Sequence, residues 1–168
     1  MPTPRSINIP AARRRYRLAT DDDSSTRLLV SRPNQHGAVS VQQERFPDPP
    51  TAMEACLHAM LRDFEHDFTP DFVRFGTAFN QWRDGRPGLR PQCAQLRAVA
   101  EEIGNRVMRL VEGYAQGYLD LQKAAAEAGT PLPEHELPDW IRSGIQSIRE
   151  GSKGAWLTMR DLVALANH

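Results

Sequence analysis

The segment "CLHAMLRDFEHDF" gathers imidazole and carboxylate side chains at spacings that could hold a metal ion. Asp63 and His66 are three residues apart, and Glu54 and His58 are four apart, so each pair would share one face of a helix. Carboxylate-bridged metal sites in helical bundles use such pairs, together with matching pairs from other helices. The other histidine near acids, His135, lies in the proline-bounded "PEHELP". We therefore predict a solvated charged face here, no metal site and no cofactor.

Catalytic signatures are missing from the sequence. It contains no nucleophile elbow, no phosphate-binding loop, no dinucleotide fingerprint and no zinc-protease motif. Cys56 sits beside Leu57 on an apolar stripe, where a thiol is usually inert. Cys56 and Cys93 form no ligand pattern and are typical of reduced thiols in an intracellular protein. The sequence contains no apolar run long enough to span a membrane. It predicts a non-enzymatic protein with no catalytic residue and a cytoplasmic location.

The most unusual stretch is "PAARRRYRLATDDDSS", in which four arginines surround a tyrosine and three aspartates follow. In one interpretation, the side chains contact nucleic-acid phosphates and stack on a base. In a second, an acid-free N-terminus is read by a specialised export machine. In a third, the arginines lie on the solvent face of an edge strand and block aggregation. The candidate contact residues of the first interpretation are Arg13, Arg14, Arg15, Tyr16 and Arg17.

Charge is distributed unevenly along the chain. The formal net charge is zero, which argues against a protein coated with nucleic acid. However, the first 20 residues hold five arginines and no acid, so the remaining 148 carry 16 basic and 21 acidic side chains. The sequence therefore indicates a basic N-terminal arm attached to a body with net negative charge.

Two glycines lie four residues apart in "GYAQGY", within the longest proline-free helical pattern. Glycine inside a helix costs up to about 1 kcal/mol relative to alanine, so this pair indicates a close-approach notch. The notch would admit a neighbouring helix of the same chain or a helix of a partner. The candidate contact residues are Gly113, Tyr114, Gly117 and Tyr118, and both tyrosine hydroxyls need a partner if they are buried.

The elements that position these residues fall into three segments. Residues 1–14 contain three prolines and little to bury, which predicts a flexible basic arm. Residues 15–46 show three short runs of alternating polarity, typical of a small antiparallel hairpin or meander. The prolines of "FPDPP" end this segment.

Residues 51–168 show helical periodicity. A capping pattern at Thr51 opens one helix, and a second begins at Thr69 because Pro70 disfavours helix continuation. A long helix over 91–128 follows, and two shorter helical segments complete the chain. The predicted fold is mainly α, with about five helices in a bundle around one long central helix, preceded by the small β-segment.

Such a sequence favours a small non-enzymatic bacterial binding protein: an adaptor, regulator or inhibitor that acts through a helical face on another protein. Alternatives are a regulator that binds nucleic acid through its basic arm, and an exported effector whose bundle binds a host protein or anionic lipid. A homodimer is compatible with the helical pattern.

Overall fold

The computed structural model describes residues 6–34, 36–85, 90–132 and 136–150. In these ranges the chain forms an antiparallel four-stranded meander, with strand order β1-β2-β3-β4, followed by three helices. The elements are β1 (Ser6–Ala11), β2 (Arg14–Thr20), β3 (Thr26–Pro33), β4 (Val39–Phe46), α1 (Pro49–Gly85), α2 (Arg90–Glu127) and α3 (Asp139–Arg149).

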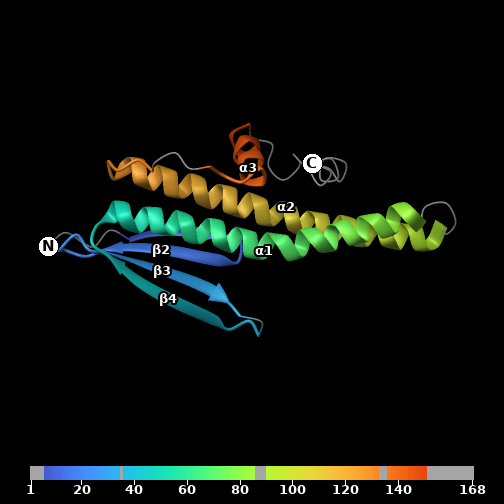
Figure 1. The fold of residues 1–168 in the computed structure, drawn as a ribbon, viewed down its shortest axis with the longest axis horizontal. Helices are drawn as coiled ribbons and strands as arrows, with labels where there is room; N and C mark the ends of the chain where they lie inside the picture. Colours follow the sequence, from blue (N-terminus) through green and yellow to red (C-terminus); the bar gives the residue numbers. More distant parts are fainter. Residues whose placement is uncertain (1–5, 35, 86–89, 133–135, 151–168) are drawn as a thin grey trace.

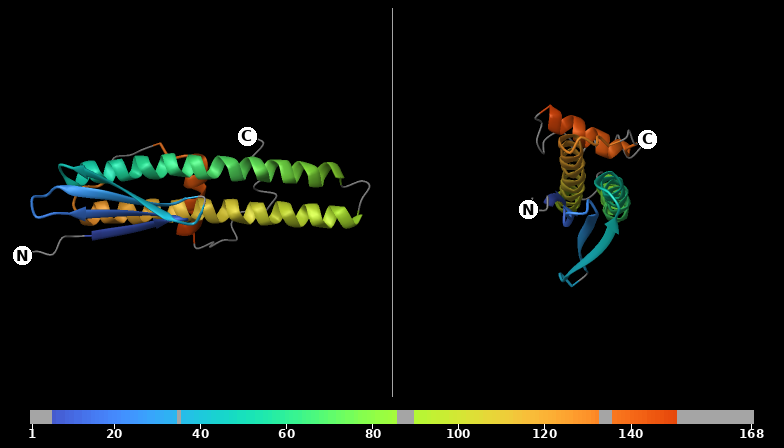
Figure 2. Two further views of the ribbon diagram at one scale, coloured as in Figure 1. Left: turned by 90° about the horizontal axis from the view of Figure 1, so that it is seen from below. Right: turned by 90° about the vertical axis from the view of Figure 1, so that its left-hand side faces the viewer.

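Helices α1 and α2 form a long antiparallel hairpin, and the sheet covers only one end of it (Figure 1). The other end of the hairpin extends beyond the sheet. Helix α3 crosses α2 on the side away from the sheet (Figure 2). None of the helices in the described ranges is long and apolar enough to cross a membrane.

The prediction of a five-helix bundle around one central helix is wrong. The described chain has three helices, and two of them are equally long partners rather than one spine with shorter neighbours. The predicted N-terminal meander is present, with four strands. The additional strand, β1, lies in the segment for which the sequence predicts a flexible arm. The last predicted helical segment, residues 151–168, lies outside the described residues.

Helix α1 runs through Pro70, where the sequence predicts a boundary between two helices. A proline inside a helix removes one backbone hydrogen bond and costs about 3 kcal/mol. Aromatic packing spans this position: Phe68 stacks on Phe64 and Phe72, with centroid distances of 5.0 and 5.1 Å. Trp140 of α3 contacts Phe68 and Phe72 at 5.0 and 5.4 Å. These contacts align the aromatic side chains that precede and follow Pro70, and this packing offsets the free-energy cost of the lost backbone hydrogen bond.

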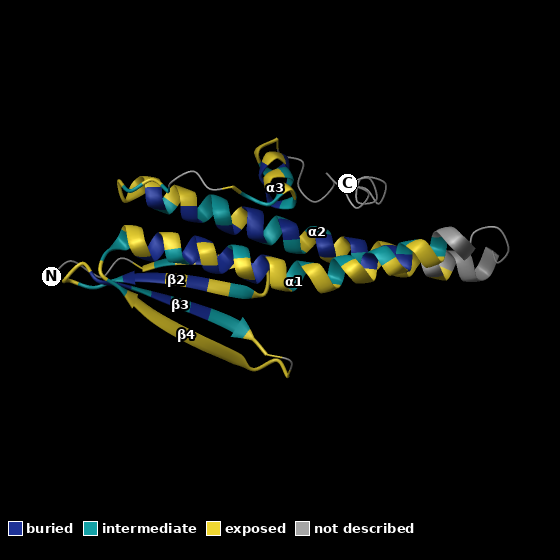
Figure 3. Cartoon of the chain, in the orientation of Figure 1, coloured by how far each residue is buried: buried dark blue, intermediate teal, exposed yellow. Residues whose placement is uncertain are grey.

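Alternation along the strands, interrupted in β2 at the buried Ala19, builds the main core. Tyr16 and Leu18 of β2 and Leu28 and Val30 of β3 point toward the helices and are buried, while their neighbours point away. They pack on the apolar stripe of α1 and on α2. Figure 3 shows this buried layer ending at β4, which is exposed along most of its length.

The aspartate run forms the turn between β2 and β3. The backbone N–H of Asp21 donates to the Ser25 carbonyl at 2.8 Å, and Ser24 has a φ of +68°. The Asp23 carboxylate accepts bonds from the N–H and the hydroxyl of Ser25, which lowers the pKa of Asp23. The run is therefore a turn of the meander.

Candidate functional site

Arg14 points inward from β2 and is bound by a carboxylate of α1. Its Nε and Nη2 donate to the two oxygens of Asp67 at 2.8 and 2.7 Å, a bidentate pair. Tyr114 of α2 donates its hydroxyl to Asp67 Oδ2 at 2.8 Å. Three elements that are distant in the sequence are therefore joined at Asp67.

Asp63, one turn earlier on α1, is the second acceptor. The Tyr16 hydroxyl donates to it at 2.6 Å, and Arg32 of β3 donates from Nε and Nη2 at 3.3 and 3.1 Å. Arg14 Nη1 lies 3.5 Å from it. Asp63 is only 8% exposed, so its charge depends on these partners. We call this group the buried charge cluster: Arg14, Tyr16, Arg32, Asp63, Asp67 and Tyr114.

The pKa shifts of Arg14, Tyr16, Asp67 and Tyr114 hold these four groups in their ordinary protonation states. Burial acts to raise the pKa of Asp67, but the bonds from Arg14 and Tyr114 outweigh it and lower that pKa. Burial and nearby charge raise the pKa of both Tyr16 and Tyr114. The bond to Asp67 raises the pKa of Arg14. The groups with shifted pKa values therefore bind one another rather than exchange protons near neutral pH.

The sequence predicts that the whole acidic and histidine segment lies on a solvated face. His58 and Glu54 do lie on an exposed surface, 3.8 Å apart, but Asp63 is buried and Asp67 is partly buried under β2. Within the described residues no group of three His, Cys, Asp or Glu side chains has a metal-binding arrangement. The Cys56 thiol is fully buried, and burial raises its pKa to about 12.

Of the five predicted contact residues of the arginine stretch, four divide between the two faces of the sheet, and Arg13 lies in the β1–β2 turn. Arg14 and Tyr16 are bound inside the cluster, whereas Arg13, Arg15 and Arg17 are exposed. Strand β2 lies between β1 and β3, so it is an interior strand and not the predicted edge. The Arg17 Nε donates to Ser6 on β1 at 2.8 Å.

The glycine notch of α2 receives the end of β1 and, at Gly117, also the side chain of Met60 from α1. A Cβ at Gly113 would lie 2.7 Å from the backbone nitrogen of Ala12, and one at Gly117 would lie 3.2 Å from the Pro10 carbonyl oxygen. The β1–β2 turn at Ala12, with φ of +55°, therefore fits against α2. Tyr114 is buried beside the notch and Tyr118 is half-buried.

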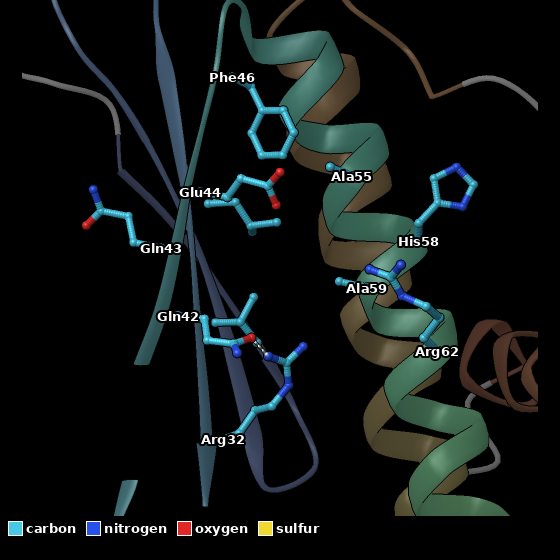
Figure 4. A pocket seen from close by; sticks show the side chains of 11 residues that line it. Arg32, Gln42, Gln43, Glu44, Phe46, Ala55, His58, Ala59 and Arg62 are labelled. Carbon is cyan, nitrogen blue, oxygen red and sulfur yellow. Dashed lines mark hydrogen bonds between the residues drawn. The ribbon is translucent and has the colours of Figure 1, made fainter. Parts of the chain in front are cut away.

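A groove of about 800 Å³ lies between β4 and α1. Figure 4 shows Gln42, Glu44 and Phe46 pointing from β4 toward the helix, while Gln43 points to the other side. Apolar side chains from β3, β4 and α1 form its floor, and polar side chains surround it. The floor is Leu28, Val30, Phe46, Ala55 and Ala59; the polar side chains are those of Arg32, Gln42, Glu44, His58 and Arg62.

Neither the charge cluster nor the groove is predicted by the sequence. One signal was available for the cluster: Asp63 and Asp67 flank Phe64 at helical spacing, which places them at the border of the apolar stripe. No local signal identifies Arg32 as a partner of Asp63, because the contact joins residues 31 positions apart. The groove is lined by residues of β3, β4 and α1, and no short motif encodes how these elements are placed relative to one another.

Comparisons with known protein families, with curated proteins and with solved structures find no match to this chain.

Proposed function

We propose that this protein is a non-enzymatic binding protein that captures an extended segment of another protein as a fifth strand beside β4. One observation carries the proposal: β4 is an edge strand with seven of its eight residues exposed, and it borders the groove over α1. Strand addition to a free sheet edge is a recurrent mode of peptide recognition. Backbone hydrogen bonds supply affinity in that mode, and pockets for alternate side chains supply specificity.

The register identifies the backbone groups that are free to bind. The Asn34 N–H donates to the Ala38 carbonyl at 2.7 Å, so these two residues form a hydrogen-bonded pair. In an antiparallel ladder bonded and non-bonded pairs alternate. Val39, Val41, Gln43 and Arg45 belong to the non-bonded pairs with β3, so their N–H and C=O groups point to the free edge.

The opposite edge of the sheet differs from β4. Strand β1 packs on α2, with Ile9 and Ala11 fully buried and its end in the glycine notch. Within the described part of the chain no element covers β4 in this way, and Val39 and Val41 are 64% and 58% exposed. An exposed edge of this kind is the one at which a sheet can extend.

The groove supplies positions for the side chains of an added strand. Its floor is apolar, so alternate side chains of the captured segment would bury apolar surface against Phe46, Ala55 and Ala59. At the rim, Arg62 is exposed and forms no ion pair with another described residue, so it can pair with a carboxylate of the segment. A groove of this volume lies within the usual range for ligand sites.

The test uses two variants at one position. Gln43→Pro removes an N–H that points to the free edge, whereas Gln43→Ala shortens the same side chain and keeps the N–H. Peptides selected from a random displayed library against the parent protein should have alternating apolar residues. They should bind Gln43→Ala nearly as well as the parent, and Gln43→Pro at least tenfold more weakly.

Two results would contradict the proposal. One is equal binding of the selected peptides to both variants, since strand addition needs the N–H. The other is a parent protein that is dimeric in light scattering and becomes monomeric only on Gln43→Pro, because a second copy would then occupy the edge. Circular dichroism and thermal melts of both variants serve as the folding control.

The helical face that the sequence analysis favours for binding stays a prediction. Its strongest support is the part of the α1–α2 hairpin that extends beyond the sheet, where Val73 and Val99 are 61% and 48% exposed. Adaptor, regulator and inhibitor roles are all compatible with capture of a partner segment.

A further inference from the structure

We infer that the outer face of the sheet is a second binding site, for the phosphate backbone of single-stranded nucleic acid. This face is the one turned away from the helices (Figure 2). It is independent of the β4 edge proposed above, since it uses side chains on the face rather than backbone groups at the edge.

Side-chain alternation defines the composition of this face. Because Tyr16, Leu18, Leu28 and Val30 point inward, the residues between them point outward. The outward strand positions include four arginines and no carboxylate. They are Ser6, Asn8, Pro10, Arg15, Arg17, Ala19, Arg27, Leu29, Ser31, Pro33, Val39, Val41, Gln43 and Arg45.

The four arginines form a continuous track across three strands. Arg15 and Arg17 are two residues apart on β2, about 7 Å. Arg17 is opposite Leu29, so Arg27, two residues before Leu29, is its diagonal neighbour at about 7 to 8 Å. Arg27 is directly opposite Arg45 on β4, at about 5 Å. Successive arginine positions are therefore about 5 to 8 Å apart, in the order Arg15, Arg17, Arg27 and Arg45, and form one continuous row.

The charges of this track are only partly compensated. Arg27 and Arg45 share one carboxylate, Asp21, with N–O distances of 3.3 and 3.8 Å. Arg15 forms no ion pair with another described residue, and Arg17 is bonded to a neutral serine hydroxyl. Like charges directly opposite each other destabilise a sheet, so the Arg27–Arg45 pair favours the binding of an anion.

A single nucleic-acid strand fits this track better than an acidic protein patch does. Its phosphates repeat along one backbone, as the arginines repeat along one path, and guanidinium groups bind phosphate oxygens in bidentate fashion. Leu29 lies directly opposite Arg17 and two residues from Arg27, and it offers apolar surface to the bases. No aromatic side chain occupies an outward position of the described strands, so we expect binding with little sequence preference.

This site differs from the one that the sequence analysis predicts. Arg14 and Tyr16 are not part of it, because both are bound in the buried charge cluster. Arg27 and Arg45 replace them, although they lie outside the arginine stretch and are brought to it only by strand pairing.

The experiment measures fluorescence anisotropy of a labelled oligothymidylate of about 20 nucleotides over a series of salt concentrations. Contacts to three or four phosphates predict a slope of about −2 to −3 for log K against log salt. Arg15→Gln with Arg17→Gln should weaken binding at low salt by roughly tenfold or more and make the slope shallower by about 1.4, for two lost phosphates. Asp21→Asn should strengthen binding, because it frees Arg27 and Arg45.

The matched control is Arg97→Gln with Arg106→Gln on α2, which removes the same charge from an exposed helical surface. It should leave both affinity and slope unchanged. An equal loss in the control would overturn the inference, because net charge alone would explain the binding. Absence of salt-dependent binding, or tighter binding to a duplex of equal length or to phosphatidylserine vesicles, would also overturn it. Gln43→Pro should bind the oligonucleotide like the parent, which separates this site from the β4 edge.

Discussion

The two faces of the sheet use the same types of residue for opposite purposes. On the inner face, Arg14 lies in a bidentate pair with Asp67 and the Tyr16 hydroxyl binds Asp63. On the outer face, Arg15 and Arg17 alternate with them along the same strand and remain exposed. Depth decides what a charge does here: the buried arginine needs its carboxylate for stability, and the exposed one is available to a ligand.

The largest expected effect is on the inner face. Asp63→Ala should lower the free energy of unfolding by about 3 to 5 kcal/mol, because Arg14, Arg32 and Tyr16 all lose a buried partner. Urea denaturation followed by circular dichroism measures it. Glu65→Ala is the control on the exposed side of the same helix and should change stability by less than about 0.5 kcal/mol. Equal effects of the two variants would show that the cluster does not stabilise the fold.

The glycine notch provides the next largest effect and tests how β1 is held. Gly113→Ala should destabilise by about 1 to 3 kcal/mol, since its Cβ would lie 2.7 Å from the Ala12 nitrogen. Gly76→Ala, in a helix position with no atom within 4 Å of the new Cβ, should stabilise by about 0.5 to 1 kcal/mol. Chemical denaturation curves of both variants should therefore shift in opposite directions; a shift in the same direction would place the notch away from β1.

Acid should weaken the inner face selectively. The pKa of Asp67 is lowered in the folded state below its ordinary value of 3.8, by the bonds from Arg14 and Tyr114. Its contribution to stability is therefore present above about pH 4 and is lost as pH falls through the folded-state pKa. Thermal melts from pH 5 to pH 2 should show a smaller acid-induced loss for Asp67→Asn than for the parent. If the melting temperatures of the parent and of Asp67→Asn fell in parallel with pH, Asp67 would have the same pKa in the folded and the unfolded state.

The smallest expected effect is on the outer face. Arg15→Gln and Arg17→Gln should each change the free energy of unfolding by less than about 0.5 kcal/mol, because both side chains are exposed. Arg14→Gln should cost several times more, since it leaves Asp67 without its bidentate partner. If all three variants melted alike in the same buffer, the distinction between the two faces would fail.

Local patterns were sufficient to predict several elements. The alternation of Tyr16 and Leu18 with Arg15 and Arg17 predicted which side of β2 is apolar, and it is buried. The apolar spacing of residues 91–128 predicted a helix close to the observed bounds of α2. Both patterns depend only on the period of strand or helix geometry. They failed at Pro70, where aromatic packing from Phe64 to Phe72 and from Trp140 outweighs a local helix-breaking preference.

The candidate sites were much less accessible to prediction. The arginine stretch was visible as composition, yet Asp67, the bidentate partner of Arg14, lies 53 residues away on α1. The sequence predicts a notch for a helix at the α2 glycines, whereas the groups that lie against Gly113 and Gly117 are the end of β1 and Met60 of α1, and their identity required the fold. The exposed β4 edge also required it, because strand order alone distinguishes an edge from an interior strand.

The sequence by itself determined the periodicities: which segments alternate, which follow a helical repeat, and that basic charge is concentrated near the N-terminus. Tertiary structure alone decided which arginines became buried partners of Asp63 and Asp67 and which were left on an open face with Arg27 and Arg45. The physical reason is that side-chain period is a local property of the backbone. Burial and pairing depend instead on contacts between segments that are distant in sequence and meet only when the sheet packs on α1 and α2.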